Sequence, residues 1–220
     1  ENAVFVRPDD SKMPVDFFIE RGHLKGAKNG EKVIVKFLTW PQRVKSPFGA
    51  VVEILGAPGT MDVEMHSILA EFGFPFKFPN EVTVESEKIK EADYKVEAKK
   101  RRDFRDVLTF TIDPHDAKDF DDALSYKELN NGNIEIGIHI ADVSHYVQPN
   151  TELDKEAYSR GNSVYLVDRV IPMLPEILSN KLCSLRPEET KLTFSAVFEL
   201  DKEAKVVSEW FGKTIIYSIF

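Results

Sequence analysis

Residues 111–123 read TIDPHDAKDFDDA and contain five aspartates, at positions 113, 116, 119, 121 and 122. Carboxylates held within a few ångströms of one another repel and raise each other's pKa unless a divalent cation lies among them. The stretch offers oxygen donors, one histidine and no cysteine, which favours Mg²⁺ or Mn²⁺ over zinc. We therefore predict a metal site formed by Asp113 at a strand end and by Asp119, Asp121 and Asp122 from the following loop.

Two other interpretations of this loop can be compared with the metal site. EF-hand calcium loops need glycine at the sixth position and an acidic residue at the twelfth. Counting from Asp113 puts Lys118 and Leu124 there, and counting from Asp119 puts Leu124 and Asn130 there, so neither register fits. The remaining alternative is an acidic turn whose aspartates cap the next helix or face solvent.

A magnesium cluster at this place would have a definite chemical use. Mg²⁺ binds few protein carboxylates, keeps several waters and completes its shell with phosphate oxygens. Two such ions about 4 Å apart activate water and stabilise the leaving oxygen of an in-line displacement. The aspartate loop therefore predicts hydrolysis at a phosphate ester.

The elements before this loop predict a small β domain. Residues 1–56 alternate short apolar runs with turn residues, and Val33, Val35 and Phe37 have the period-2 spacing of a strand that follows the Asn29-Gly30 turn. Several short strands at this spacing predict a small closed barrel. An amphipathic helix follows, marked by Met61, Met65, Ile68, Leu69 and Phe72 at helical spacing. Residues 75–102 are rich in charge and predict a surface connector with some helix.

The second half of the chain predicts a mixture of strands and helices. Residues 107–141 are expected to form two strands separated by the aspartate bend, the first with Leu108, Phe110 and Ile112 on one face. Residues 150–161 predict a short helix with Thr151 and Asp154 at capping-box spacing, residues 175–185 a second helix, and residues 191–200 another strand. We predict a mixed α and β fold with domains at 1–58, 59–102 and 103–220.

The charge of the chain does not decide its partner. The net charge of −8 argues against nucleic acid, because phosphates are neutralised by Lys and Arg. However, residues 99–105 read KKRRDFR, and the first sixty residues carry nine Lys/Arg against seven Asp/Glu. We leave open whether KKRRDFR contacts phosphates or is a solvated linker.

The apolar runs and the cysteine content of the sequence bear on the cellular location of the protein. No stretch approaches the roughly 20 apolar residues of a membrane span, and no secretory signal opens the sequence. Cys183 is the single cysteine, so no internal disulfide forms, and we expect a buried structural thiol. We predict a cytoplasmic monomer without a membrane partner. Because the sequence begins at Glu1 and ends inside the apolar run TIIYSIF, we expect a piece of a longer protein.

Longer phrases around the loop form an ordered set. TIDPHDAKDFDDAL, IHIADVSHYV, SVYL and VIPMLPEILSNKLCSL together resemble the opening of the RNB catalytic domain of the ribonuclease II and ribonuclease R exoribonuclease family. Upstream, FVRPDD and GAVVEILGAPGT resemble the family's second cold-shock (OB) domain. The resemblance covers nearly the whole chain and implies a small OB-like β-barrel followed by the N-terminal part of a mixed α/β RNB domain.

This resemblance implies an activity and a set of site residues. The family's enzymes are processive, hydrolytic 3′→5′ exoribonucleases that release nucleoside 5′-monophosphates from single-stranded RNA and need Mg²⁺. Asp113, Asp119, Asp121 and Asp122 match the four active-site aspartates, with Asp121 most directly tied to the chemistry. Tyr165 aligns with the tyrosine that packs on the nucleotide at the RNA 3′ end, and an aromatic ring is a sequence-tolerant platform for a base.

Further residues are assigned by their place in the predicted elements. Phe5 and Phe17 lie where an OB barrel displays stacking residues, so we predict that both contact RNA. The alternative is a place in the core, where most phenylalanines of a small barrel lie. The histidine and aspartate set His139, Asp142 and His145 resembles a ligand group, but Asp142 is out of phase with the histidines on a strand. We therefore expect structural roles for these three.

The resemblance also implies what this sequence lacks. Members of the family continue beyond the matched region through a transition-state arginine, a second aromatic clamp and an S1 domain, and they carry a first cold-shock domain. We therefore expect the metal cluster without its complete pocket, and no activity from the piece alone. Two alternatives stay open: a noncatalytic single-stranded RNA-binding module, and a metal-dependent hydrolase of small phosphate esters.

Overall fold

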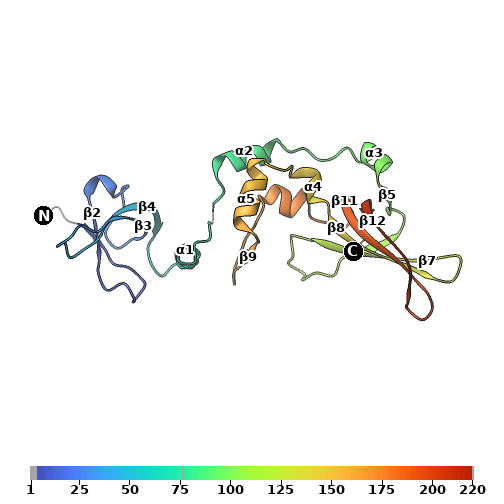
Figure 1. The fold of residues 1–220 in the computed structure, drawn as a ribbon, viewed down its shortest axis with the longest axis horizontal. Helices are drawn as coiled ribbons and strands as arrows, with labels where there is room; N and C mark the ends of the chain where they lie inside the picture. The colour runs from blue at the N-terminus through green and yellow to red at the C-terminus, as the bar shows by residue number, and fades with distance from the viewer. Residues whose placement is uncertain (1–3, 76, 220) are drawn as a thin grey trace. The chain divides into compact units, whose positions relative to one another are not determined.

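The structure is a computed structural model that describes residues 4–75 and 77–219. The chain separates into two compact units at residues 76 and 77 (Figure 1). The finer domain boundaries at 58/59 and 102/103 stay predictions. In the described ranges, no helix combines the length and the apolar character that a membrane span requires.

The first unit is built on a four-stranded sheet. The strands lie in the order β1 (Val4–Val6), β2 (Phe17–Ile19), β4 (Phe48–Gly56) and β3 (Lys32–Thr39). The β2–β4 pair is parallel, whereas β1–β2 and β3–β4 are antiparallel. A Cβ on Gly49 would overlap the Val35 side chain, so glycine allows the two strands of the hairpin to close over the core. The strand expected around Val33 and Phe37 is confirmed.

A helix and a short 3₁₀ turn complete the first unit. The turn η1 (Arg21–His23) lies between β2 and β3, and α1 (Met61–Glu71) follows β4. The predicted helix is therefore confirmed, with Val63 and Leu69 buried. Its predicted apolar stripe is only partly buried, because Met61 and Phe72 are exposed.

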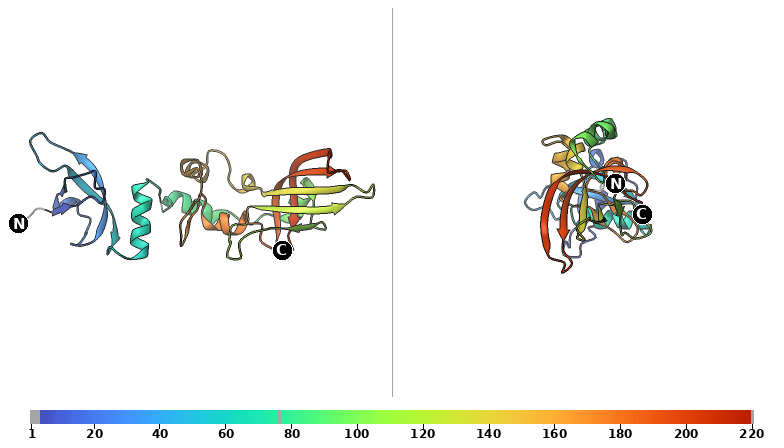
Figure 2. Two further views of the ribbon diagram at one scale, coloured as in Figure 1. Left: turned by 90° about the horizontal axis from the view of Figure 1, so that it is seen from below. Right: turned by 90° about the vertical axis from the view of Figure 1, so that its right-hand side faces the viewer.

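A six-stranded sheet forms one end of the second unit (Figure 2). Its order is β5 (Arg102–Asp103), β12 (Val206–Tyr217), β11 (Thr190–Leu200), β8 (Ile134–Ala141), β7 (Asp122–Glu128) and β6 (Leu108–Phe110). Only the β5–β12 pair is parallel among these described strands. The expectation of two strands over 107–141 is wrong, because β7 lies between them. Its inward residues include Ala123 and Ser125, so no apolar period marks it.

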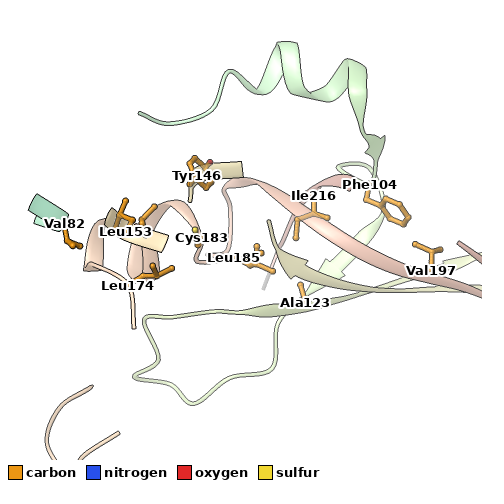
Figure 3. Packing of buried hydrophobic residues seen from close by; sticks show 12 residues of the cluster. Val82, Phe104, Ala123, Tyr146, Leu153, Leu174, Cys183, Leu185, Val197 and Ile216 are labelled. Atoms are coloured by element: carbon orange, nitrogen blue, oxygen red, sulfur yellow. The ribbon is translucent and has the colours of Figure 1, made fainter. Parts of the chain in front are cut away.

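Most helices of the second unit gather beside the sheet around one apolar core, whereas α3 (Tyr94–Glu97) and η2 (Ala98–Lys100) lie next to β5 and β12 (Figure 1). The others are α2 (Asn80–Lys88), α4 (Val143–Tyr146), α5 (Glu152–Arg160) and the π-helical segment η3 (Leu178–Leu182), with the small hairpin β9 (Val164–Tyr165) and β10 (Val170–Ile171). As predicted, Thr151 caps α5 by accepting the Asp154 N–H at 3.2 Å. The core joins these helices to the sheet through residues that include Leu153, Cys183 and Ile216 (Figure 3).

One face of the large sheet buries polar side chains beside the apolar core residues Ala123, Val197 and Ile216. His139 is fully buried, with Nδ1 2.6 Å from Ser195 Oγ and Nε2 2.8 Å from Ser125 Oγ. The Ser195 hydroxyl also lies 2.5 Å from Thr214 Oγ1. Of the apolar face predicted for the first strand of residues 107–141, Leu108 and Ile112 are exposed, whereas on β11 Phe194 is exposed and Leu192 is buried. Burial of the polar face is possible because its groups satisfy each other's hydrogen bonds.

Candidate active site

The aspartate loop connects β6 to β7 and spreads its carboxylates over different surroundings. Asp113 and Asp119 are half-buried, Asp121 and Asp122 are exposed, and Asp122 is the first residue of β7, opposite Ile140. Asp113 carries a buried Oδ2 that has no hydrogen-bond partner within the described residues. The loop thus combines exposed carboxylates with one buried oxygen that is available to a ligand.

The backbone of this loop is tied to the protein on two sides. Ser184 is fully buried, and its hydroxyl accepts the Phe120 N–H at 3.1 Å and donates to the Lys118 carbonyl at 2.9 Å. The Leu185 N–H donates to the Phe120 carbonyl at 2.7 Å, and the Ala141 N–H on β8 donates to the Asp121 carbonyl at 3.1 Å. These bonds hold Asp119 and Asp121 on either side of an anchored residue. Sequence reasoning missed the part played by Ser184, because a serine inside an apolar motif gives no signal of it.

The charges of the loop act on one another. The pKa of Asp121 is raised above its ordinary value. The largest cause is the loss of solvent around its carboxylate, and the negative charges of Asp119, Asp122 and Asp113 follow. Each of the three neighbours disfavours its ionised form, as expected when carboxylates crowd together. The aspartates are therefore close enough to interact electrostatically.

The same aspartates do not form a finished ligand cage. Within residues 4–75 and 77–219, no group of three or more His, Cys, Asp or Glu side chains is arranged to hold a metal ion. Mutual repulsion favours separate orientations, and Asp119 is turned toward a hydroxyl rather than toward its neighbours. The ligand roles assigned from the sequence therefore stay predictions. The donor chemistry fits Mg²⁺ or Mn²⁺, since all four groups are carboxylates and Asp113 offers an unpartnered oxygen.

Tyr165 lies beside the aspartate loop. Its hydroxyl donates to Asp119 Oδ2 at 2.7 Å, although 46 residues separate the two in sequence. The hydrogen bond to Asp119, followed by burial, raises the pKa of Tyr165 to about 12. Its side chain remains 64% exposed, which leaves the ring accessible to a base. The structure thus brings together two site residues that the sequence reasoning assigned separately.

Phe5 and Phe17 lie in the first unit. Phe5 is 53% exposed and packs edge-on against Phe18 at 5.7 Å between ring centroids, whereas Phe17 is half-buried. Both line a groove whose other residues include the acids Asp9, Asp10, Asp16, Glu31, Glu64 and Glu71. An aromatic surface is present there, but the acidic lining disfavours phosphates. Their RNA contacts stay predictions.

The histidine and aspartate set has the structural roles expected of it. His139 is held between two serines, and burial together with the charge of Arg102 lowers its pKa to about 4. Asp142 is buried against Arg101, with 2.7 Å between the charged atoms. Burial by itself would raise the Asp142 pKa, but hydrogen bonds from Ser144, Arg101 and Lys213 lower it. These contacts give His139 and Asp142 roles in holding the fold.

The basic run at 99–105 is largely taken up by the fold. Arg101 is buried in its ion pair, Arg102 pairs with Glu135 at 2.6 Å, and Arg105 pairs with Asp103. The intervening Phe104 is a core residue at 1% exposure. The run is therefore part of the folded unit rather than a linker, with Lys99 and Lys100 exposed at its start, and a contact with phosphates stays a prediction.

A cavity of about 690 Å³ adjoins the aspartate loop. Sequence reasoning did not single out this cavity. Its polar lining is mostly basic or amide and consists of Lys118, Glu176, Asn180, Lys181 and Arg186. The signal that could have indicated it is the pair of cations, Lys181 and Arg186, that flanks the segment carrying Ser184.

Comparisons with known protein families agree with the architecture. Residues 101–219 match the RNB domain and residues 5–79 match a cold shock domain. The RNB match covers more than half of the chain, and it includes the aspartate loop, Ser184 and Tyr165. The chain therefore belongs to the RNB domain family.

Individual relatives and solved structures give the degree of similarity to members of that family. Ribonuclease R of Thermotoga maritima is 44% identical over 205 residues, which cover 92% of this chain and 29% of the relative. The solved structure of Mycoplasma genitalium RNase R in complex with double-stranded RNA has a TM-score of 0.84 at 25% identity, covering 93% of this chain and 36% of that one. The structure of yeast Ssd1, a pseudonuclease, has a TM-score of 0.73 at 23% identity, covering 99% of this chain and 28% of that one. The chain thus spans less than a third of the length of that Thermotoga maritima ribonuclease R.

Proposed function

We propose that the whole protein is a metal-dependent, processive 3′→5′ exoribonuclease that hydrolyses single-stranded RNA to nucleoside 5′-monophosphates. The observation that carries this proposal is the aspartate loop, in which Asp113, Asp119, Asp121 and Asp122 lie close enough that burial and then the charges of the other three raise the pKa of Asp121. Its place in an RNB domain that follows a cold shock domain supports RNA as the substrate. The cytoplasmic location and the monomeric state belong to the same proposal.

The aspartates would hold the metal through oxygen atoms. Asp113, Asp119, Asp121 and Asp122 are the ligands we assign, and the unpartnered Oδ2 of Asp113 is the best-prepared of their atoms. When bound at such a site, Mg²⁺ or Mn²⁺ lowers the pKa of water and stabilises the charge on a leaving phosphate oxygen. Ser184 positions the loop by holding the backbone on both sides of Asp119.

Tyr165 would place the last nucleotide of the RNA. Its exposed ring offers a stacking surface, and its hydroxyl bond to Asp119 fixes that surface relative to the aspartate loop. Stacking does not depend on base identity, which suits an enzyme that removes every nucleotide in turn. In the first unit, Phe5 and Phe17 would contribute further stacking to the bound strand.

Replacement of Asp121 in the whole protein tests this proposal. Asp121→Asn keeps the size of the side chain but removes its charge, so we expect the rate of mononucleotide release from labelled single-stranded RNA to fall at least about 100-fold, corresponding to several kcal/mol. RNA affinity measured without divalent ions should stay near wild type. Asp116→Asn, in the same loop but outside the assigned set, is the matched control. Unchanged turnover in Asp121→Asn would remove this residue from the mechanism.

A second candidate is a noncatalytic single-stranded RNA-binding module. It is favoured by the finding that the described aspartates do not converge on one ligand position. The two candidates differ in a digest with Mg²⁺. Retention of RNA without product by the whole protein would support the binding module, whereas mononucleotide product that disappears in Asp121→Asn would support the enzyme.

A further inference from the structure

The hairpin formed by β3 and β4 has an exposed outer half. Every residue from 36 to 45 is exposed, which includes the end of β3 and the loop that leads to β4. A strand in a closed barrel buries alternate residues, so exposure of successive residues means that this part extends beyond the sheet's core. Figure 2 shows the two strands as a long ribbon that extends from the first unit.

This outer half combines large apolar side chains with cations. Phe37, Leu38, Trp40 and Val44 are 53%, 45%, 48% and 41% exposed. Lys36, Arg43 and Lys45 lie between and beside them and are exposed as well. Residues 32–52 contain no Asp or Glu, although the chain as a whole carries a net charge of −8. The positive charge of the hairpin is thus not offset by acids of its own.

Two cations beside the groove at Phe5 are paired with acids. Lys32 lies 2.8 Å from Glu64 and 3.1 Å from Asp9, and Arg7 lies 3.9 Å from Asp16. The groove beside Phe5 is lined by these acids and several more. A polyanion is therefore repelled from the groove and attracted to the tip of the hairpin.

Trp40 is held in place at this tip. Its indole N–H donates to the Val44 carbonyl at 3.1 Å, a bond that closes the loop across four residues. An exposed indole ring whose orientation is set by the backbone is a prepared platform for a base. Positively charged grooves or loops with aromatic rings are typical of proteins that bind single-stranded nucleic acid, and loops of OB folds bind oligonucleotides.

We infer that the outer half of the β3–β4 hairpin, defined as residues 36–45, is a second RNA contact, in which Trp40 and Phe37 stack on bases while Lys36, Arg43 and Lys45 neutralise phosphates. This inference rests on the proposed function for one point, namely that the partner is single-stranded RNA. It does not depend on catalysis, since none of these residues lies in the unit that carries the aspartates.

Salt-dependent binding tests the cationic part. Anisotropy of a 5′-fluorescein-labelled 20-nucleotide oligo(U) is measured in EDTA, with the chain as it exists, at several salt concentrations. The triple variant Lys36→Gln, Arg43→Gln and Lys45→Gln should reduce the slope of log K against log[salt] by about 2, because each single-strand phosphate contact contributes about 0.7. The control triple variant Lys12→Gln, Arg21→Gln and Lys28→Gln removes the same charge from exposed positions of the same unit and should leave the slope unchanged.

Substitution of the ring tests the stacking part. Trp40→Ala should weaken binding by about 5- to 150-fold with an unchanged salt slope, and Trp40→Phe should keep most of the affinity because it keeps an aromatic face. Circular dichroism of each variant checks that the sheet is intact. Equal effects of the two triple variants, or wild-type affinity in Trp40→Ala, would overturn the inference.

The outcomes separate this inference from the proposed function. If wild type binds no RNA, both the hairpin contact and the RNA-directed activity of this chain are refuted. If wild type binds RNA and the hairpin variants match it, only the hairpin contact is refuted. If the whole protein degrades no RNA but the hairpin variants still weaken binding, only the catalytic proposal is refuted. Binding to phosphatidylserine vesicles in place of RNA would assign the hairpin to a membrane and overturn the inference.

Discussion

Ser184→Ala is the sharpest test of how the fold positions the aspartates. The hydroxyl of this fully buried serine makes two hydrogen bonds, one from the Phe120 N–H at 3.1 Å and one to the Lys118 carbonyl at 2.9 Å. Alanine fits the same space and loses both bonds. Since one intramolecular hydrogen bond contributes about 0.5–1.5 kcal/mol, we expect the free energy of unfolding of the second unit to fall by about 1–3 kcal/mol.

Urea unfolding followed by fluorescence measures this loss, because Trp210 lies in the second unit and Trp40 in the first. The transition of the second unit should move to lower urea at an unchanged m-value. Ser179→Ala is the matched control, since its hydroxyl donates only to the neighbouring Asn180 side chain at 3.2 Å. In the whole protein, Ser184→Ala should also lower nuclease activity, because the loop on both sides of Asp119 loses its anchor. Equal stability of Ser184→Ala and wild type would refute the reasoning.

Three other predictions follow from named contacts. Tyr165→Phe should keep the affinity for the RNA 3′ end, whereas Tyr165→Ala should lose about 1–3 kcal/mol of stacking, as measured with a fluorescent base at that end. His139 is buried in its neutral form with its pKa lowered to about 4, so its stabilising effect is complete above pH 6.5 and is lost as the pH falls toward 4. The free energy of unfolding should therefore drop by up to about 1.4 kcal/mol per pH unit in that window, and His139→Gln should abolish this component in urea titrations. Asp142→Ala removes the buried carboxylate 2.7 Å from Arg101 and leaves that guanidinium only its pair with Glu97, so it should cost up to about 3–5 kcal/mol in urea unfolding, whereas replacing both Asp142 and Arg101 with apolar residues should recover part of the loss.

Much of the local structure could be predicted from the sequence because short-range chemistry determines it. The cap at Thr151 and the stop at Gly161, which has a φ of 76°, follow from hydrogen bonding and backbone sterics within a few residues. The isoleucine alternation of β8 likewise marked a strand. The apolar burial of Cys183, which raises its pKa to about 12, agrees with the expected structural thiol.

The remainder depended on residues far apart in the chain. Strand β7 was missed because its buried positions are polar or small, and their partners lie on β8. The contact between Tyr165 and Asp119 joins two segments that the sequence treats separately. Arg101 belonged to an apparently solvated basic run, and its burial depends on the distant Asp142 as well as on the nearby Glu97.

The buried polar face of the large sheet fixes the register of the strands that carry the candidate active site. Gly137 lies on this face opposite Ser125, and a Cβ there would overlap the Ser125 hydroxyl and crowd the His139 ring. Glycine therefore leaves space for the hydrogen-bonded set. Because side chains alternate along a strand, a slip of one residue between β7 and β8 would move His139 and Ser125 to the other face and leave their polar groups unpaired.

The same register places the candidate active site. Asp122 pairs with Ile140, one residue from His139 on β8, and the Asp121 carbonyl accepts the Ala141 N–H at 3.1 Å. A register defined only by apolar packing would tolerate small shifts, whereas hydrogen bonds at 2.6 and 2.8 Å to both ring nitrogens of His139 permit one alignment. The polar interior thus holds the carboxylates at the start of β7 in place from the opposite face of the sheet.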